Sequence, residues 1–179
     1  GKTHEEEGKE ATIRVAADET TPAFLRFLDR PGQKYDFNPH LSIPFKMKAG
    51  RLVGRITVRV DKDTHLYYQW RRHNIPPLQP GPTFYIRPGG KLCLTNGREL
   101  MRVPLGQWAT FEVTGTLGVA PASPFTLRVR LPGEEKPREF RDLPAPGAGF
   151  RAMDSLFIVA QGVAKAQFDV KDIELVPAD

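Results

Sequence analysis

The chain has 179 residues, 40% of which are hydrophobic, and a formal net charge of +5. This length predicts one domain with enough apolar residues to form a core. The single cysteine, Cys93, excludes an internal disulfide, and its neighbours Leu92 and Leu94 indicate a buried thiol rather than a nucleophile. No apolar run approaches the ~18 residues of a membrane-spanning helix, and no signal-peptide core begins the sequence. We therefore expect a soluble chain which, if secreted, has been processed or cut from a longer protein.

The first eleven residues are rich in charge and have no apolar period, which predicts a flexible linker over residues 1–11 and a folded domain over residues 12–179. In that domain, apolar residues recur at every second position, the period of a β-strand with one buried face. The clearest case is 52–60, where Ile56, Val58 and Val60 alternate with polar residues. The predicted strands are 12–17, 24–28, 41–48, 52–60, 65–72, 83–87, 91–95, 99–103, 109–114, 125–131, 138–143, 155–161 and 167–176.

Turn residues separate these runs about every eight to twelve positions. Asn96-Gly97 is the strongest hairpin signal, and Pro44 makes 41–48 an edge or bulged strand. A proline-rich loop after Arg72 is a candidate rim for function, because long loops over a rigid sheet often carry function. No repeat or helix is evident, so we predict an all-β, two-sheet antiparallel β-sandwich of the jelly-roll type.

The strand predicted at 65–72 has unusual chemistry on both faces. Leu66, Tyr68 and Trp70 are expected in the core, whereas Tyr67, Gln69 and Arg71 alternate with them and face outward. The neighbouring strand presents Tyr85 and Arg87 in the same way. Trp108, at the start of a strand, is expected to plug one end of the sandwich.

Several short motifs resemble those of one group of domains. They are Gly-x-Trp before Phe-Glu-Val at 106–113, Leu-Gly at 117–118, Phe-Thr-Leu-Arg-Val ending in Pro-Gly at 125–133, Phe-x-Val-x-Asp-Ile-x-Leu at 168–175, and the segments 27–32 and 37–40. Together they resemble the concanavalin A-like (laminin-G-like) jelly rolls that are attached to secreted bacterial polysaccharide-acting proteins. The resemblance implies stacked sheets with ligands on a concave face or loop rim, an extracellular location, and further domains in a parent chain.

The resemblance also implies one structural calcium ion, with Asp29 and Asp172 as the positions to examine. Carboxylates are ligands that such hard cations prefer. An equally open alternative is that Asp172 caps a turn or pairs with an arginine. The four histidines do not have zinc spacing, and no other cofactor is expected.

The carboxylates argue against a glycosidase. Hydrolases of this fold carry Glu-x-Asp-x-x-Glu on one strand, because retaining hydrolysis needs two carboxylates about 5 Å apart. No such run occurs, and Glu134-Glu135 lies in a predicted turn. A polysaccharide lyase acting on a uronate-containing glycan stays open, with Arg71 neutralising the uronate, Tyr67 or His73 as catalytic residue, and His40 or His73 as base.

Binding without catalysis uses the same residues. Sugars are held by flat aromatic rings and planar polar groups, and the arginine fork matches carboxylates or sulfates. We therefore predict a non-catalytic module that binds a polysaccharide, favouring an anionic one, with no nucleic-acid partner and no membrane insertion. A lyase and a structural spacer are the alternatives. The predicted ligand-binding residues are Tyr67, Gln69, Arg71, Tyr85, Arg87, His40 and His73.

Overall fold

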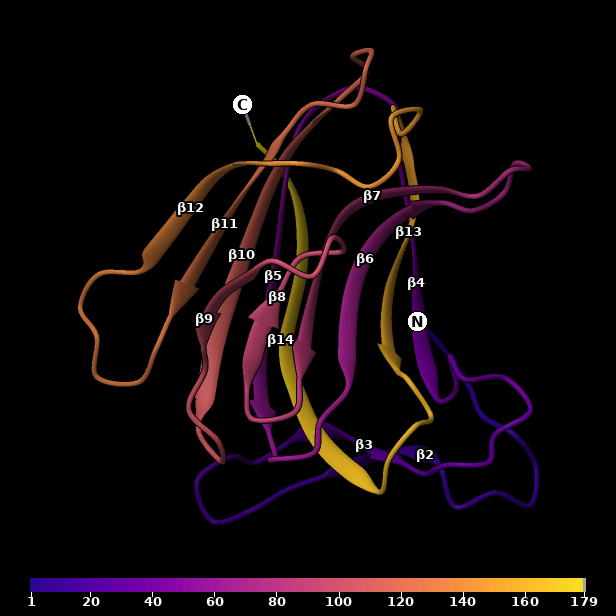
Figure 1. The fold of residues 1–179 in the computed structure, drawn as a ribbon, viewed down its shortest axis with the longest axis vertical. Coiled ribbons are helices and arrows are strands. Elements are labelled where there is room, and N and C mark those ends of the chain that lie inside the picture. Colours follow the sequence, from indigo (N-terminus) through magenta and orange to yellow (C-terminus); the bar gives the residue numbers. More distant parts are fainter. Residues whose placement is uncertain (179) are drawn as a thin grey trace.

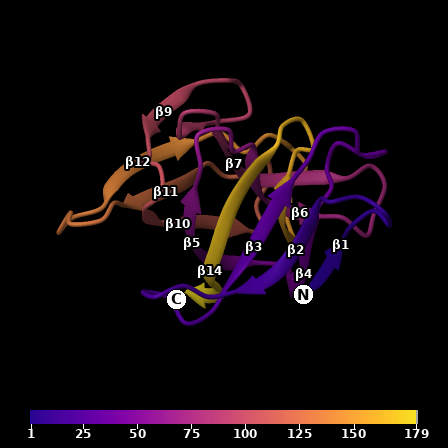
Figure 2. The same cartoon turned by 90° about the horizontal axis from the view of Figure 1, so that it is seen from below.

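The computed structural model describes residues 1–178 as two antiparallel sheets of seven strands each, stacked as a sandwich (Figures 1 and 2). The prediction of an all-β two-sheet sandwich is confirmed. The first sheet, here called the cleft sheet, has the order β1 (Lys2–His4), β4 (His40–Met47), β13 (Met153–Ala160), β6 (Leu66–Arg72), β7 (Gln79–Arg87), β8 (Lys91–Cys93) and β9 (Glu99–Arg102).

The second sheet, here called the back sheet, covers the inner face of the first. The back sheet has the order β12 (Arg138–Leu143), β11 (Phe125–Arg130), β10 (Trp108–Leu117), β5 (Gly50–Val60), β14 (Ala166–Ala178), β3 (Phe24–Asp29) and β2 (Thr12–Ala16). Residues 1–178 include no helix long and apolar enough to cross a membrane.

The core lies where the apolar positions of the two sheets meet. Tyr68 and Trp70 are fully buried, as predicted, and the Trp70 Nε1–H donates to Tyr68 Oη at 2.8 Å. The back sheet makes room for these rings with glycines, since a Cβ on Gly54 would lie 2.3 Å from Tyr68 Oη and one on Gly115 would lie 3.0 Å from Trp70. Cys93 is buried as well. The large rings of β6 thus point inward, and their neighbours in sequence point outward.

Of two local expectations from the sequence, one is confirmed and the other is wrong. The predicted bulge near Pro44 is present, because the β4–β13 register shifts between Met153 and Ser155, which is the partner of Pro44. Trp108 does not plug the sandwich end. It alternates with the buried Ala109 and packs on the outer face of the back sheet, with the Arg59 guanidinium 4.5 Å from its ring centroid.

The N-terminal residues form part of the sandwich rather than a separate linker. Lys2–His4 pair with Ser42, Leu41 and His40 and add an edge strand to the cleft sheet (Figure 2). The carboxylate of Glu6 accepts hydrogen bonds from the backbone N–H groups of Lys34 and Tyr35 at 2.7 and 2.9 Å. Local charge predicted a flexible linker over residues 1–11, whereas Lys2–His4 and Glu6 within it have partners elsewhere in the chain.

Candidate functional site

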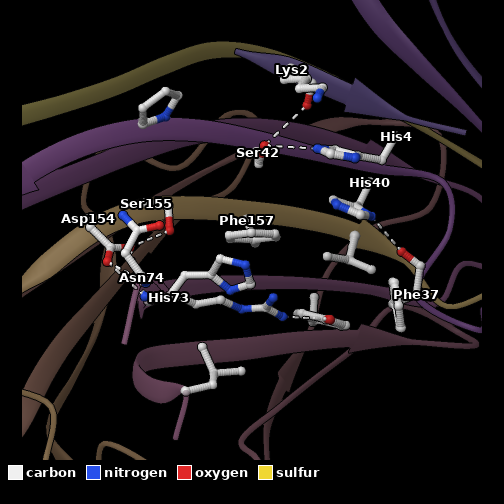
Figure 3. Close-up of a pocket in the computed structure, with 15 residues that line it drawn as sticks. Lys2, His4, Phe37, His40, Ser42, His73, Asn74, Asp154, Ser155 and Phe157 are labelled. Carbon is white, nitrogen blue, oxygen red and sulfur yellow. Dashed lines mark hydrogen bonds between the residues drawn. The ribbon is translucent and has the colours of Figure 1, made fainter. Parts of the chain in front are cut away.

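A cleft of about 810 Å³ lies on the outer face of the cleft sheet, across β4, β13 and β6 (Figure 3). Strand β1 and the loop after Arg72 supply its walls, so part of the predicted rim loop does border it. In Figure 3, Phe157 lies in the middle, His40 and Phe37 lie at one end, and Asp154 lies at the other.

Strand register explains why these residues meet. Side chains at paired positions of neighbouring strands form rows across one face of a sheet. Three such rows run across the face of the sheet that carries the cleft. They are His40–Val159–Tyr67–Tyr85, Ser42–Phe157–Gln69–Thr83 and Pro44–Ser155–Arg71–Pro80.

Arg71 is the most constrained side chain of the cleft. Its guanidinium carbon lies 3.9 Å from the ring centroid of Phe157, a stacked cation–π arrangement. Its Nε–H donates to Gln69 Oε1 at 2.6 Å, and one terminal N–H donates to Tyr67 Oη at 2.9 Å. The guanidinium is thus held in one plane before any ligand arrives.

Gln69 supports this arrangement from below. Only 8% of the Gln69 surface is exposed. Its side-chain amide N–H donates to Thr83 Oγ1 at 3.0 Å, and the Thr83 hydroxyl in turn donates to the Gly81 carbonyl. Gln69 therefore positions Arg71 rather than facing the cleft. Tyr67 does line the cleft, and burial, partly offset by Arg71, raises the pKa of its hydroxyl.

No carboxylate within residues 1–178 forms an ion pair with Arg71. An arginine has five N–H donors, and the contacts with Gln69 and Tyr67 use two of them. Donors therefore remain for an anion in the cleft. Lys2 lies on the opposite wall and adds a second cationic side chain.

His40 is held as one tautomer. Its Nδ1 lies 3.1 Å from both the Phe37 carbonyl oxygen and Asn38 Oδ1, while the Asn38 amide N–H donates to Glu6 and so fixes the amide orientation. Because both neighbours of Nδ1 are acceptors, the proton resides on Nδ1 and Nε2 keeps its lone pair. Burial and the nearby His4 lower the pKa of His40 to about 4, so the ring is neutral at pH 7.

Asp154 fixes the loop that follows β6. Burial opposes ionisation of its carboxylate, but hydrogen bonds from the backbone N–H groups of Asn74 and His73 lower its pKa overall. The His73 ring is thereby held 5.3 Å from that of Phe157. Asp154 is engaged by the backbone and does not neutralise Arg71.

Tyr85 and Arg87 lie beside the cleft rather than in it. The Tyr85 ring contacts that of Tyr67, with centroids 5.4 Å apart, and Arg87 lies 5.6 Å from the Tyr85 ring. Both line a separate shallow depression with Asp36 and Gln161. The seven predicted residues therefore divide into four that line the cleft (His40, Tyr67, Arg71, His73), one beneath it (Gln69), and two beside it (Tyr85, Arg87).

The two predicted calcium ligands do not come together. Asp29 pairs with Ala166 on β14, and Asp172 lies further along that strand by about 20 Å at the usual rise per residue. Asp172 is exposed, with a left-handed φ of 49°, where β14 shifts register. Within residues 1–178 no group of three or more His, Cys, Asp or Glu side chains suits a metal. One ion cannot bind both positions, and a calcium ion stays a prediction from the resemblance alone.

Asp29 itself is unusual. Its carboxylate is fully buried, and within the described chain neither oxygen has a hydrogen bond of standard geometry, although backbone N–H groups of Arg30 and Gly162 lie nearby. Burial raises its pKa to about 7. The group is therefore partly protonated near neutral pH.

Several cleft residues were missed by the sequence reasoning. Phe157 lies in a run that is apolar on both faces, so period-two patterning does not reveal which side chains point outward. His4 lies in the segment expected to be a linker, yet its ring stacks on His40 with centroids 4.2 Å apart. The aromatic residues of segment 34–40 could have indicated a ligand-binding role for Phe37, which lines the cleft.

No protein-family model and no curated protein matches this sequence. Solved structures do match its fold. An endo-β-1,4-glucuronan lyase from the fungus Trichoderma reesei is 9% identical, with a TM-score of 0.63 over 98% of this chain and 90% of that one. An alginate lyase from Aplysia kurodai is also 9% identical, with a TM-score of 0.65 over 93% and 87%.

A protein of a different kind shares the architecture too. The globular domain of Trypanosoma cruzi (T. cruzi) calreticulin is 13% identical, with a TM-score of 0.56 over 99% of this chain and 84% of that one. At these identities the likeness establishes the fold alone. What the cleft does must be argued from its own residues.

Proposed function

We propose that the cleft binds an acidic polysaccharide and that Arg71 recognises a carboxylate or sulfate of the chain. The observation that carries this proposal is the state of Arg71: it is stacked on Phe157, oriented by Gln69 and Tyr67, and free of any carboxylate partner within residues 1–178. A preorganised guanidinium loses little side-chain entropy on binding and pairs with planar anions through two hydrogen bonds.

Two further features support this choice. The residues that line the cleft come from four strands and two loops, with aromatic and apolar side chains between its polar groups, which suits a sugar chain better than a small compact ligand. In addition, two solved structures with this fold are named as lyases of glucuronan and of alginate. The positive net charge of +5 agrees with an anionic partner.

Affinity electrophoresis and calorimetry test the proposal. We expect the chain to bind a polyuronate, to bind a neutral glucan at least tenfold more weakly, and to lose affinity for the polyuronate as salt is raised. Arg71→Ala should abolish the binding. Arg51→Ala is the matched control, because it removes an equal charge from an exposed position of the back sheet. Equal binding by the Arg71→Ala variant and the unaltered chain would overturn the proposal.

A second candidate function, β-elimination of the bound uronate, is favoured by the tautomer of His40. A neutral imidazole with a free Nε2 is able to accept the proton α to the uronate carboxylate while Arg71 neutralises that carboxylate. The C–O bond at the β position then breaks, and the Tyr67 hydroxyl donates a proton to the leaving oxygen. The product is an unsaturated uronate.

Near-ultraviolet absorbance separates the two functions. If the chain is a lyase, incubation with polyuronate produces a growing absorbance that is lost in both His40→Ala and Tyr67→Phe. If the chain only binds, the polyuronate is retained without any absorbance change. A structural spacer would show neither result.

We also propose, from the motifs that resemble concanavalin A-like jelly rolls, that the chain belongs to that group and works outside the cell beside other domains of a larger protein. The resemblance supports this placement. Detection of the chain in culture medium of its source would test the extracellular location.

A further inference from the structure

The loop between β3 and β4 holds two aromatic rings in solvent. Tyr35 and Phe37 are 45% and 43% exposed, and their rings stack on each other with centroids 5.2 Å apart and planes 19° from parallel. The Lys34 ammonium lies 5.1 Å from the centroid of the Tyr35 ring. Clustered aromatic rings that a fold leaves exposed are a characteristic of binding surfaces, because burial would otherwise stabilise them.

The loop is anchored through its backbone and not by burial of the rings. Glu6 accepts hydrogen bonds from the backbone N–H groups of Lys34 and Tyr35 and from the side chain of Asn38. At the other end, the carbonyl of Phe37 accepts the hydrogen bond from His40 Nδ1. The backbone of the loop is therefore held in place while both side chains stay nearly half exposed, an arrangement that lowers the entropic cost of stacking a ligand against the outer side of the ring pair.

The ring pair continues the cleft. Phe37 lines the end of the cleft beside His40, with ring centroids 5.9 Å apart (Figure 3). Asp36, between the two aromatic residues, lines the neighbouring depression that contains Tyr85 and Arg87. A chain that leaves the cleft past His40 thus meets this loop next.

We propose that Tyr35 and Phe37 form an aromatic subsite that stacks on a pyranose ring of the acidic polysaccharide, beyond the sugar recognised by Arg71. This inference rests on the proposed function and adds a second contact to it. The C–H face of a pyranose carries partial positive charge and suits the electron-rich face of an aromatic ring. Lys34 supplies a cation beside the ring pair, as an acidic sugar requires.

The test compares oligouronates of increasing length, from disaccharide to octasaccharide, by calorimetry. The double variant Tyr35→Leu/Phe37→Leu keeps the loop anchors and apolar side chains but removes the flat rings. We expect it to bind the longest oligomers about tenfold more weakly than the unaltered chain, with no change for the disaccharide. The double variant Val15→Ala/Val176→Ala, which alters exposed apolar side chains of the back sheet, should bind all lengths normally.

The outcomes separate this inference from the proposed function. If Arg71→Ala abolishes binding while Tyr35→Leu/Phe37→Leu follows the unaltered chain at every length, the aromatic subsite is wrong and the cleft proposal stands. If the unaltered chain binds no oligouronate of any length, both are wrong. The double variant Tyr35→Phe/Phe37→Tyr keeps two flat rings in exchanged positions. If it binds the longest oligomers about as tightly as the unaltered chain while Tyr35→Leu/Phe37→Leu does not, the result supports stacking over a general apolar contact.

Discussion

The guanidinium of Arg71 lies over the ring of Phe157, with its carbon 3.9 Å from the ring centroid, although the two residues come from strands far apart in sequence. They meet because β13 pairs with β6 in a register that sets Phe157 opposite Gln69 and Ser155 opposite Arg71. The aromatic face and the two hydrogen bonds from Arg71 together define the plane in which an anion is expected to bind.

Phe157→Ala should therefore weaken polyuronate binding without removing a charge. We expect a loss of about tenfold in affinity, because Arg71 would lose the ring that orients it. Calorimetry measures the affinity, and circular dichroism checks that the variant is folded. Phe157→Tyr keeps a flat ring and should retain most of the binding; similar affinity in the alanine and tyrosine variants would show that the stacking does not matter.

Gly54→Ala should destabilise the sandwich by about 2–3 kcal/mol, because overpacking a filled core forces side chains out of their rotamers. The added methyl would lie 2.3 Å from Tyr68 Oη. Urea unfolding measures the change. Adding Tyr68→Phe to this variant removes the clashing oxygen, so the double variant should lose less than the sum of the two single changes. Simple additivity would mean that the clash is relieved in another way.

Asp29 should make the protein less stable as pH rises from about 4 to 7. The pKa of its carboxyl is raised by burial to about 7, against about 3.9 in the unfolded chain, so between these values the folded state binds more protons. The free energy of unfolding should fall by up to about 4 kcal/mol across that range. Chemical denaturation at stepped pH measures it, and Asp29→Asn, which cannot ionise, should lack this decrease.

His40 should produce the opposite slope. Burial lowers its pKa to about 4, whereas an unfolded histidine titrates near 6.5, so the unfolded state takes up the proton first. Its contribution to stability is present above about pH 6.5 and is lost as pH falls toward 4, by on the order of 3 kcal/mol. The effect is best measured in the Asp29→Asn background. A His40→Gln variant with an unchanged pH profile would contradict this assignment.

Glu6→Ala should free the loop at residues 34–38, since its carboxylate binds two backbone N–H groups and the Asn38 side chain. Hydrogen exchange of the Lys34 and Tyr35 amides should become faster by at least tenfold. Glu7→Ala, a neighbouring exposed carboxylate, is the control. If amide exchange does not change, then Glu6 does not hold the loop.

The alternation of apolar and polar residues was sufficient to predict the sandwich and the outward direction of Tyr67 and Arg71, with Tyr68 and Trp70 in the core. This inference succeeds because successive side chains of an extended strand point to opposite faces, a geometric property of the local chain. The bulge at Pro44 follows from equally local chemistry, the missing N–H of proline.

Only the tertiary structure decided which of these side chains share a site. Phe157 and His40 share the cleft with Arg71 because of the non-local order β4–β13–β6, and the register of those pairings is set by the packing of the whole sheet. The same register separates Asp29 from Asp172 along β14. Periodicity within a segment fixes the face on which a side chain lies; its neighbours on that face depend on strand pairing, which no single segment encodes.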